Sequence, residues 1–154
     1  MWSPKNYDGK FEGQMKLRAA LAKSKNLVSV RVIRKIGPRY AQDFIQRFGF
    51  EAEKHPPYLT MALGAGSVTP LELATGYGVF ANGGYRVEPY LISKVIDAKG
   101  NVLFEASPQK AGDPNLRALD ARTAFVMDSL LQEVTKSGTA ASARPALGRS
   151  DIAG

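Results

Sequence analysis

A serine and an asparagine stand two positions apart in Ser24-Lys25-Asn26, with a cation between them. A hydroxyl can donate and accept hydrogen bonds at once, and a carboxamide can bond one peptide group through both of its polar atoms. This pattern could therefore relay a proton and hold a peptide substrate. Ser and Asn are also frequent at helix ends, where their side chains bond nearby backbone groups. A capped helix junction is the alternative interpretation, and spacing alone does not choose between the two.

Few other residues could carry chemistry. The 154 residues include no cysteine, which excludes disulfides, thiol nucleophiles and thiolate metal sites. The one histidine, His55, excludes multi-histidine metal clusters and leaves little room for a Ser-His-Asp triad. Because it stands in a polar loop beside Pro56-Pro57, we expect it to be solvated rather than catalytic. We expect no metal and no cofactor.

Two segments resemble catalytic motifs in composition only. The segment Ser107-Pro108-Gln109-Lys110 matches the pattern Ser-x-x-Lys. As a catalytic motif this pattern needs a helix, which brings the lysine back onto the serine. Gly112 and Pro114 just beyond oppose a helix, so we interpret the match as chance. Residues 59–66 are glycine-rich, but the spacing fits no phosphate-binding fingerprint, and tight backbone packing is the better interpretation.

The net charge of +7 would suit nucleic acid or another anionic polymer. The densest basic run, residues 31–39, is however interrupted by apolar residues, as on a helix with one solvated face. With no nucleic-acid motif in the chain, we expect no nucleic-acid partner. No apolar run approaches the ~20 residues that a membrane span needs, and residues 1–5 do not look like a signal peptide.

Apolar periodicity predicts five main helices, at residues 14–23, 27–36, 38–48, 70–81 and from Asp120 to about 136, with a short one at 139–146. The periodicity predicts buried positions at Leu17, Ala20 and Leu21, and an inner helix face of Ala124, Met127, Leu131 and Val134. It also predicts apolar stripes at Val28, Val32 and Ile36, at Tyr40, Phe44 and Phe48, and at Leu73, Tyr77 and Phe80.

The helix at 70–81 has the clearest start, because Thr69, Pro70 and Glu72 form a capping box. Its internal glycines, Gly76 and Gly78, suggest close approach of a neighbour. A strand at 85–96, a turn at 97–100 and a returning strand at 101–105 predict one β-hairpin. A polar linker follows at 106–117. The fold class is therefore α+β and mainly helical.

Several of these segments combine in one order along nearly the whole chain. They are Trp2-x-Pro4-x-Asn6-Tyr7 with Gly13, Leu17-Arg18-x-Ala20-Leu21, Ser24-x-Asn26, Gly37, Arg47-Phe48-Gly49-Phe50, Leu63-Gly64, Thr69-Pro70-Leu71-Glu72-Leu73-Ala74, Tyr77-Gly78-Val79-Phe80-Ala81-Asn82-Gly83-Gly84, Gly138-Thr139-Ala140 and Asp151-Ile152-Ala153-Gly154. This order resembles the transpeptidase domain of class A penicillin-binding proteins, the bifunctional cell-wall synthases.

The resemblance implies the fold shared by penicillin-binding proteins and serine β-lactamases, whose cleft is lined by Ser-x-x-Lys, Ser-x-Asn and Lys-Thr-Gly. It assigns Ser24 and Asn26 to the second motif as catalytic and substrate-binding residues. Ser24 would relay a proton toward the leaving amine, and Asn26 would hold an amide of the donor peptide. Lys25 matches the variable middle position, where we expect a structural contact.

Residues 1–154 would then be a partial transpeptidase domain. The family places the nucleophile before residue 1 and the Lys-Thr-Gly strand after residue 154, so we expect this chain alone to be inactive and its apolar helix faces to be left exposed. The implied partners of the intact protein are peptidoglycan stem peptides, β-lactam antibiotics, the remaining parts of the domain and a glycosyltransferase domain. The implied location is the periplasmic side of a bacterial inner membrane.

Two other functions stay open on the residues alone. A non-catalytic helical module would bind a peptide or partner without any flanking sequence. A basic surface protein would bind anionic polymers with an affinity that falls steeply with salt.

Overall fold

The helices form near their predicted positions, although the first begins at Leu17 rather than at residue 14 and the last at Ala143 rather than at residue 139. The computed structural model describes residues 2–154. Its helices are α1 Leu17–Ala22, α2 Asn26–Ile36, α3 Pro38–Ile45, α4 Pro70–Ala81, α5 Ala121–Lys136 and α6 Ala143–Leu147. Strands β1 Lys94–Ile96 and β2 Val102–Glu105 pair as an antiparallel hairpin. Within the described residues, no helix combines the length and the apolar character needed to cross a membrane.

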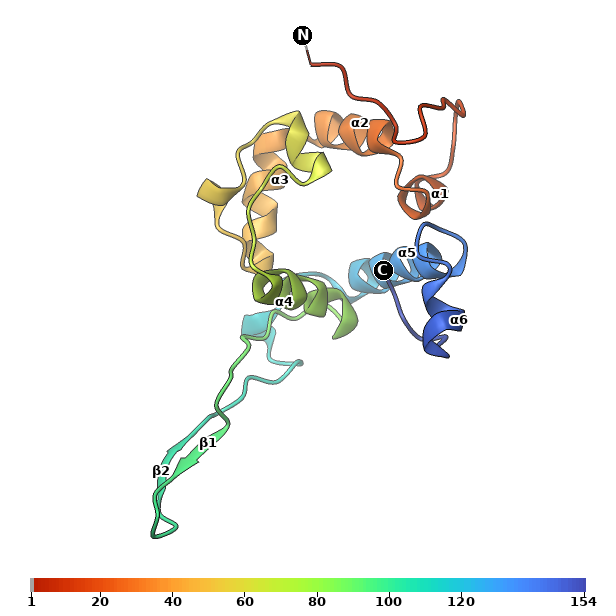
Figure 1. The fold of residues 1–154 in the computed structure, drawn as a ribbon. Helices are drawn as coiled ribbons and strands as arrows, with labels where there is room; N and C mark the ends of the chain where they lie inside the picture. Colours follow the sequence, from red (N-terminus) through yellow and green to blue (C-terminus); the bar gives the residue numbers. More distant parts are fainter. Residues whose placement is uncertain (1) are drawn as a thin grey trace.

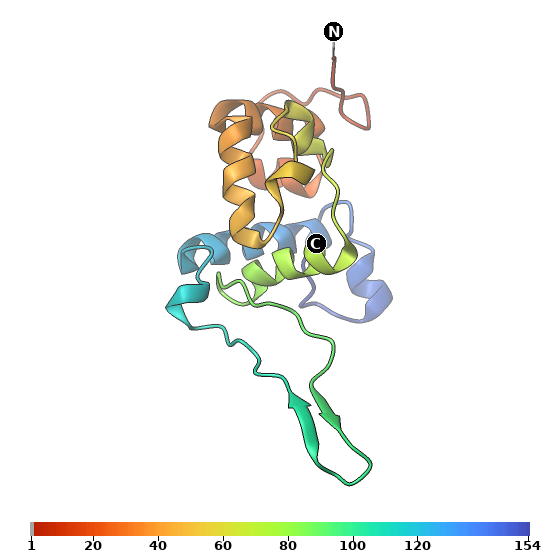
Figure 2. The ribbon, with the colours of Figure 1, turned by 90° about the vertical axis from the view of Figure 1, so that its left-hand side faces the viewer.

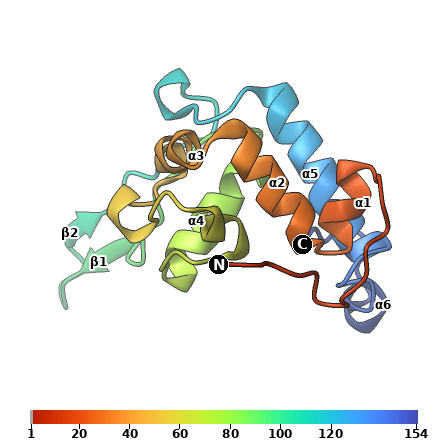
Figure 3. The same ribbon diagram turned by 90° about the horizontal axis from the view of Figure 1, so that it is seen from above.

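The helices follow one another around an open ring, from which the hairpin projects as an arm (Figures 1 and 2). Helix α1 lies beside α5, although the two are about a hundred residues apart in sequence, and α4 also contacts α5 (Figures 1 and 3). Segments from both ends of the chain therefore meet at the α1–α2 corner that carries Ser24-Lys25-Asn26.

The main core lies where α3, α4 and the segment before α5 meet. Buried Phe48, Val79, Ala118 and Leu119 form its centre, and Phe44, Phe50 and Phe80 pack around them. Gly84 joins this core to α4, because its nitrogen donates to Val79 O and its carbonyl accepts from the backbone nitrogens of Ala118 and Leu119. A Cβ at Gly84 would lie 2.5 Å from Leu119 O, so this close approach needs glycine.

The predicted capping box of α4 is confirmed. Glu72 N donates to Thr69 Oγ1 over 3.2 Å, and Thr69 N donates to Glu72 Oε2 over 2.6 Å. Close approach is confirmed at Gly76, where a Cβ would lie 2.7 Å from the Phe50 ring. It is wrong at Gly78, where a Cβ would meet nothing within 4 Å.

The hairpin is confirmed, but its first strand is shorter than predicted. Residues 85–93 form no ladder with β2, and Tyr85 instead makes an isolated bridge to Arg117. The cause is tertiary: the chain between Tyr85 and β1 runs beside the linker, where Glu88 N donates to Gln109 Oε1.

The predicted buried faces of α1 and α2 need correction. In α1 the alanines Ala20 and Ala22 are buried, whereas Leu17 and Leu21 are 62% and 39% exposed. The small residues face inward because the turn at Gly138 packs closely against α1. A Cβ at Gly138 would lie 2.3 Å from Ala22 O.

In α2 the buried residues are Val30 and Ile33, while Val32 and Ile36 are 40% and 49% exposed. Helix α2 packs on the 3₁₀ turn Leu59–Leu63, a contact that its own periodicity could not reveal. In α4, Leu73 and Tyr77 are 44% and 48% exposed, as expected for an apolar face that this chain leaves uncovered. In α5, Ala124 and Leu131 are buried as predicted, Met127 and Val134 are partly buried, and Thr135 is buried as well.

The expectation that His55 is solvated is wrong. Its side chain is buried, with its ring 5.5 Å from the Phe50 ring. The backbone of Gly66 covers it, since a Cβ there would lie 1.9 Å from His55 Nδ1. The tight packing predicted for residues 59–66 is therefore found at Gly66 but not at Gly64, where a Cβ would meet nothing within 4 Å.

Candidate active site

The corner between α1 and α2 is a tight backbone turn with Ser24 at its apex. Ser24 N donates to Leu21 O and Lys25 N to Ala20 O, both over 2.9 Å, which is the bonding pattern of a Schellman motif. The residue at the apex of this motif takes a left-handed conformation and is usually glycine. Ser24 has φ +51°, and in the described part of the chain it is the one residue other than glycine with positive φ.

The side chains at this corner do not act as helix caps. Backbone bonds close the end of α1 at Lys23, and Lys25, the N-cap residue of α2, makes no side-chain cap. Ser24 is exposed, and its hydroxyl makes no hydrogen bond to residues 2–154. Backbone strain of this kind persists only where the surrounding contacts enforce it.

Asn26 is half-buried on the first turn of α2, and its amide is held in one orientation. Its Nδ2 donates to Lys5 O over 3.0 Å. Beside it, the Asn6 side chain accepts from Leu27 N over 3.1 Å and donates to Lys10 O over 2.7 Å. Residues 5–12, which we call the strap, are therefore bonded directly to the start of α2.

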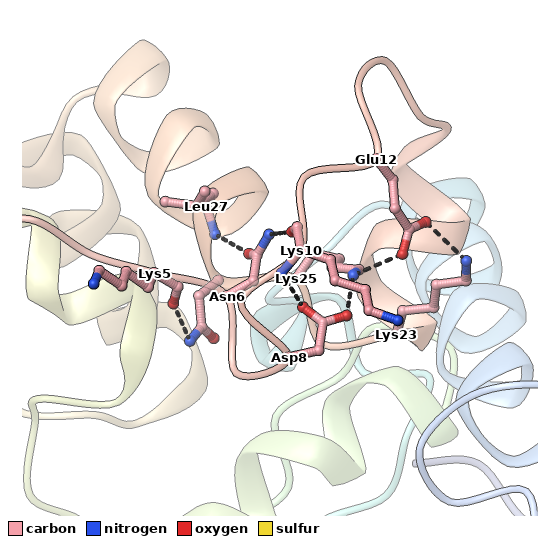
Figure 4. A network of polar contacts seen from close by, with 9 residues as sticks. Lys5, Asn6, Asp8, Lys10, Glu12, Lys23, Lys25 and Leu27 are labelled. Atoms are coloured by element: carbon pink, nitrogen blue, oxygen red, sulfur yellow. Dashed lines mark hydrogen bonds and ion pairs between the residues drawn. The ribbon is translucent and has the colours of Figure 1, made fainter.

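Lys25 makes the structural contact that the sequence suggested. Its side chain is 4% exposed, and its Nζ lies 2.6 Å from Asp8 Oδ2 and 2.7 Å from Glu12 Oε1 (Figure 4). These bonds raise the pKa of Lys25 and lower the pKa of both strap carboxyls. Lys23, which is exposed, also pairs with Glu12 over 2.9 Å. Asp8, Lys25 and Glu12 are called the clamp from here on.

Two hollows open beside the clamp. One, of about 570 Å³, lies between the strap and α2 and is lined by Phe11, Met15, Leu27 and Arg31 among others. The second, of about 380 Å³, lies between the clamp and Ser137, Gly138 and Thr139. Lys25 and Glu12 line both hollows, whereas Ser24 and Asn26 line neither.

The turn after α5 supports the corner from the opposite side. Thr139 N donates to Ala22 O over 3.0 Å, and Arg18 donates to Ser129 O over 2.7 Å. Sequence reasoning identified Gly138-Thr139-Ala140 only as part of a pattern. It missed the role of Asp8 and Glu12 entirely, because the lysine that they bind stands 17 and 13 positions away along the chain.

The Ser-x-x-Lys string at residues 107–110 is not a catalytic motif in this structure. It lies in extended, exposed chain with no helix to return Lys110 onto Ser107. Gln109 within it accepts the hydrogen bond from Glu88 N already described, which ties the linker to the chain before β1.

Comparison with known proteins identifies the family. The family model described as the penicillin-binding protein transpeptidase domain matches residues 1–154. This chain belongs to that family. Within this transpeptidase family, the chain is 50% identical to penicillin-binding protein 1A of Neisseria flavescens over 99% of its length, and 37% identical to penicillin-binding protein 1A of Pseudomonas aeruginosa over its whole length.

The fold comparison agrees. The crystal structure of penicillin-binding protein 1A from Haemophilus influenzae superimposes with a TM-score of 0.92 at 33% identity, over 99% of this chain and 28% of that one. The predicted fold class, a mainly helical part of the transpeptidase fold with one hairpin, is confirmed. The chain spans about a fifth of the length of its Neisseria relatives, 19% for the Neisseria flavescens protein.

Proposed function

We propose that this chain forms the central part of a serine-type D,D-transpeptidase domain, which cross-links peptidoglycan stem peptides through an acyl-serine intermediate. Membership of the penicillin-binding transpeptidase family supports the reaction class. The observation that carries the site is the exposed, left-handed Ser24 beside an Asn26 amide that the strap holds in place. Both polar side chains sit on a backbone turn fixed from two sides.

In this proposal the side chains of Ser24 and Asn26 have different roles. The Ser24 hydroxyl relays a proton toward the leaving amine, since it can accept one hydrogen bond while donating another. Asn26 Oδ1 accepts from an N–H of the donor peptide, because the bond from Nδ2 to Lys5 O fixes which way the amide faces. The nucleophilic Ser-x-x-Lys and the Lys-Thr-Gly strand come from segments outside these residues. The relatives are about five times longer, which leaves room for both.

The proposed partners follow from the same chemistry. They are the stem peptides, the β-lactam antibiotics that react with the same nucleophile, the remaining parts of the domain and a glycosyltransferase domain in the same protein. We place the intact protein at the periplasmic face of a bacterial inner membrane. The alternative, a non-catalytic module that binds a peptide or partner, draws its support from the large apolar side chains that this chain exposes.

Labelling with a fluorescent penicillin tests the proposal. The 154-residue chain alone should form no stable adduct, because acyl transfer lacks its nucleophile. The full-length protein should be labelled, and Ser24→Ala in it should lower transpeptidase turnover by about 10²-fold or more. The matched control is Ser107→Ala, which alters the serine of the false motif and should change neither labelling nor turnover.

Stable labelling of the short chain, or loss of labelling by Ser107→Ala, would contradict the proposal. Specific binding of stem peptide by the short chain, with no labelling of the full-length protein, would instead favour the binding module.

A further inference from the structure

Lys25 lies between the two proposed site residues, yet its side chain is directed into the strap. We propose that Lys25 is a positioning residue of the transpeptidase site: gripped by Asp8 and Glu12, it presses the strap against the corner and so fixes the orientations of Ser24 and Asn26. The inference rests on the proposed function of this corner. It assigns a functional role to the clamp, whose residues carry out no step of the reaction themselves.

The first step is the burial of the Lys25 charge. An ammonium that is only 4% exposed needs partners that replace its hydration, and here two carboxylate oxygens lie within 2.7 Å. Both carboxylates belong to the strap, whereas the lysine belongs to the corner. The strap cannot move away from the corner without breaking both ion pairs of this buried cation.

The second step leads from the strap to Asn26. With the strap held by the clamp, Lys5 O stands where it accepts from Asn26 Nδ2, and the Asn6 side chain stands where it accepts from Leu27 N (Figure 4). Lys5 O therefore selects one of the two ways in which the Asn26 amide can face. The selected orientation leaves Asn26 Oδ1 as the atom offered to a substrate N–H.

The third step leads from Lys25 to Ser24 through the backbone. Lys25 N donates to Ala20 O and thereby closes the turn that holds Ser24 at φ +51°. A serine leaves this conformation readily unless its surroundings prevent it. Anchoring the side chain of the next residue at two points, while Thr139 N binds Ala22 O behind it, provides that restraint.

The test uses the full-length protein and measures two quantities, the second-order rate of acylation by a fluorescent penicillin and the melting temperature. Lys25→Met keeps the length of the side chain and removes the charge. We expect the acylation rate to fall about 10-fold or more at temperatures where the variant is folded, because small displacements of site groups cost this much. The matched control is Lys54→Met. Lys54 also lies 2.7 Å from a glutamate, Glu51, but is 42% exposed, so its removal should change the rate less than about twofold.

A second, milder variant covers the case in which Lys25→Met does not fold. Asp8→Asn keeps the size and an acceptor oxygen, and leaves Glu12 to pair with Lys25. We expect a rate loss of about threefold or more with a smaller fall in melting temperature, since one ion pair of the clamp remains. A normal rate in Asp8→Asn, or in folded Lys25→Met, would overturn the positioning role.

A double-mutant cycle separates positioning from general stabilisation. If Lys25 acts through Asn26, the rate loss caused by Lys25→Met should be at least about threefold smaller in an Asn26→Ala background. The reason is that the effects of substitutions at coupled residues are not additive. An equal loss in both backgrounds would show that the clamp only stabilises the fold. If Ser24→Ala and Asn26→Ala themselves leave acylation and turnover unchanged, the proposed function fails instead, so the two failures can be told apart.

Discussion

At the scale of single residues, the decisive feature is a serine in a position that glycine usually occupies. The left-handed conformation of a residue with a Cβ costs about 1–2 kcal/mol, and the Ser24 hydroxyl makes no bond in the described chain to offset it. Backbone strain of this kind persists only when the surrounding contacts enforce it. Here the enforcing contacts are the clamp on one side and the turn after α5 on the other.

This strain predicts opposite outcomes for stability and function at one position. Ser24→Gly and Ser24→Ala both remove the hydroxyl and should both lose turnover. Ser24→Gly should nevertheless be the more stable by about 1 kcal/mol, because only glycine adopts φ +51° without a steric cost. Calorimetry of the full-length variants should show transpeptidase transitions about 2–4 °C apart. Equal melting temperatures would indicate that the turn relaxes in solution.

The clamp predicts how stability depends on pH. The lysine lowers the pKa of Asp8 and Glu12 below their ordinary values of 3.8 and 4.5. The unfolded chain therefore binds more protons in this range, and stability is lost as pH falls below about 4 through the lowered values. The raised pKa of Lys25 affects stability only above its ordinary value of 10.5. Between pH 5 and 10 the clamp should contribute a constant stabilisation.

Melting temperatures measured from pH 2 to 7 check this expectation. The fall at acid pH should be shallower in Lys25→Met than in the unmodified protein, because both carboxyls lose the contact that lowers their pKa most, although Lys23 still lowers the pKa of Glu12. If melting temperature falls equally with pH in the two proteins, other carboxyls dominate the loss of stability at acid pH. Asp151 is one such group, since its bonds to Arg149 lower its pKa to about 2.

At the scale of elements, α4 shows how one helix combines a strong local start with a tertiary constraint. Its capping box is local and could be identified from sequence. Its two internal glycines look alike in sequence but differ in the fold, because Gly76 faces the Phe50 ring and Gly78 faces open space. One glycine is therefore required by packing, and the other only weakens the helix.

This difference gives a matched pair of substitutions. Gly78→Ala should stabilise the domain by about 1 kcal/mol, the difference in helix propensity. Gly76→Ala gains the same propensity but forces its Cβ against the Phe50 ring, and should be about 1–3 kcal/mol less stable than Gly78→Ala. Chemical denaturation of both variants in the same background measures the difference. The same stability in both would mean that the Phe50 ring moves aside freely.

At the scale of the whole molecule, this chain exposes more surface than a self-contained globule. Its accessible surface is 10881 Å², whereas a compact monomer of this length exposes roughly 7600 Å². Large apolar side chains contribute to the excess, among them Leu91 at 92% and Phe125 at 74% exposed. The hairpin arm exposes residues on both of its faces, as Ile96 and Leu103 illustrate. The predicted exposure of apolar helix faces is found in α4 as well.

We therefore expect the isolated 154-residue chain to associate with itself. Size-exclusion chromatography should show species larger than a monomer, and a dye that binds apolar surface should fluoresce strongly. Replacing Leu91, Ile96 and Leu103 together by Ser should reduce the association, while replacing the exposed Lys99, Lys110 and Arg122 by Ser should not. A single monomeric peak with sharp thermal unfolding would contradict this expectation.

The sequence by itself determined those features of the protein that depend on neighbours along the chain. The helix starts at Thr69 and Asp120, the hairpin turn at residues 97–100 and the Ser24-Lys25-Asn26 pattern are all local, so residue types and spacing are enough to identify them. Only the tertiary structure decided which faces are buried, why His55 is enclosed, and what holds Lys25. Those outcomes depend on contacts between segments far apart in the chain, such as Gly138 against Ala22 and Asp8 against Lys25. A local sequence pattern does not encode which distant segment will pack against it.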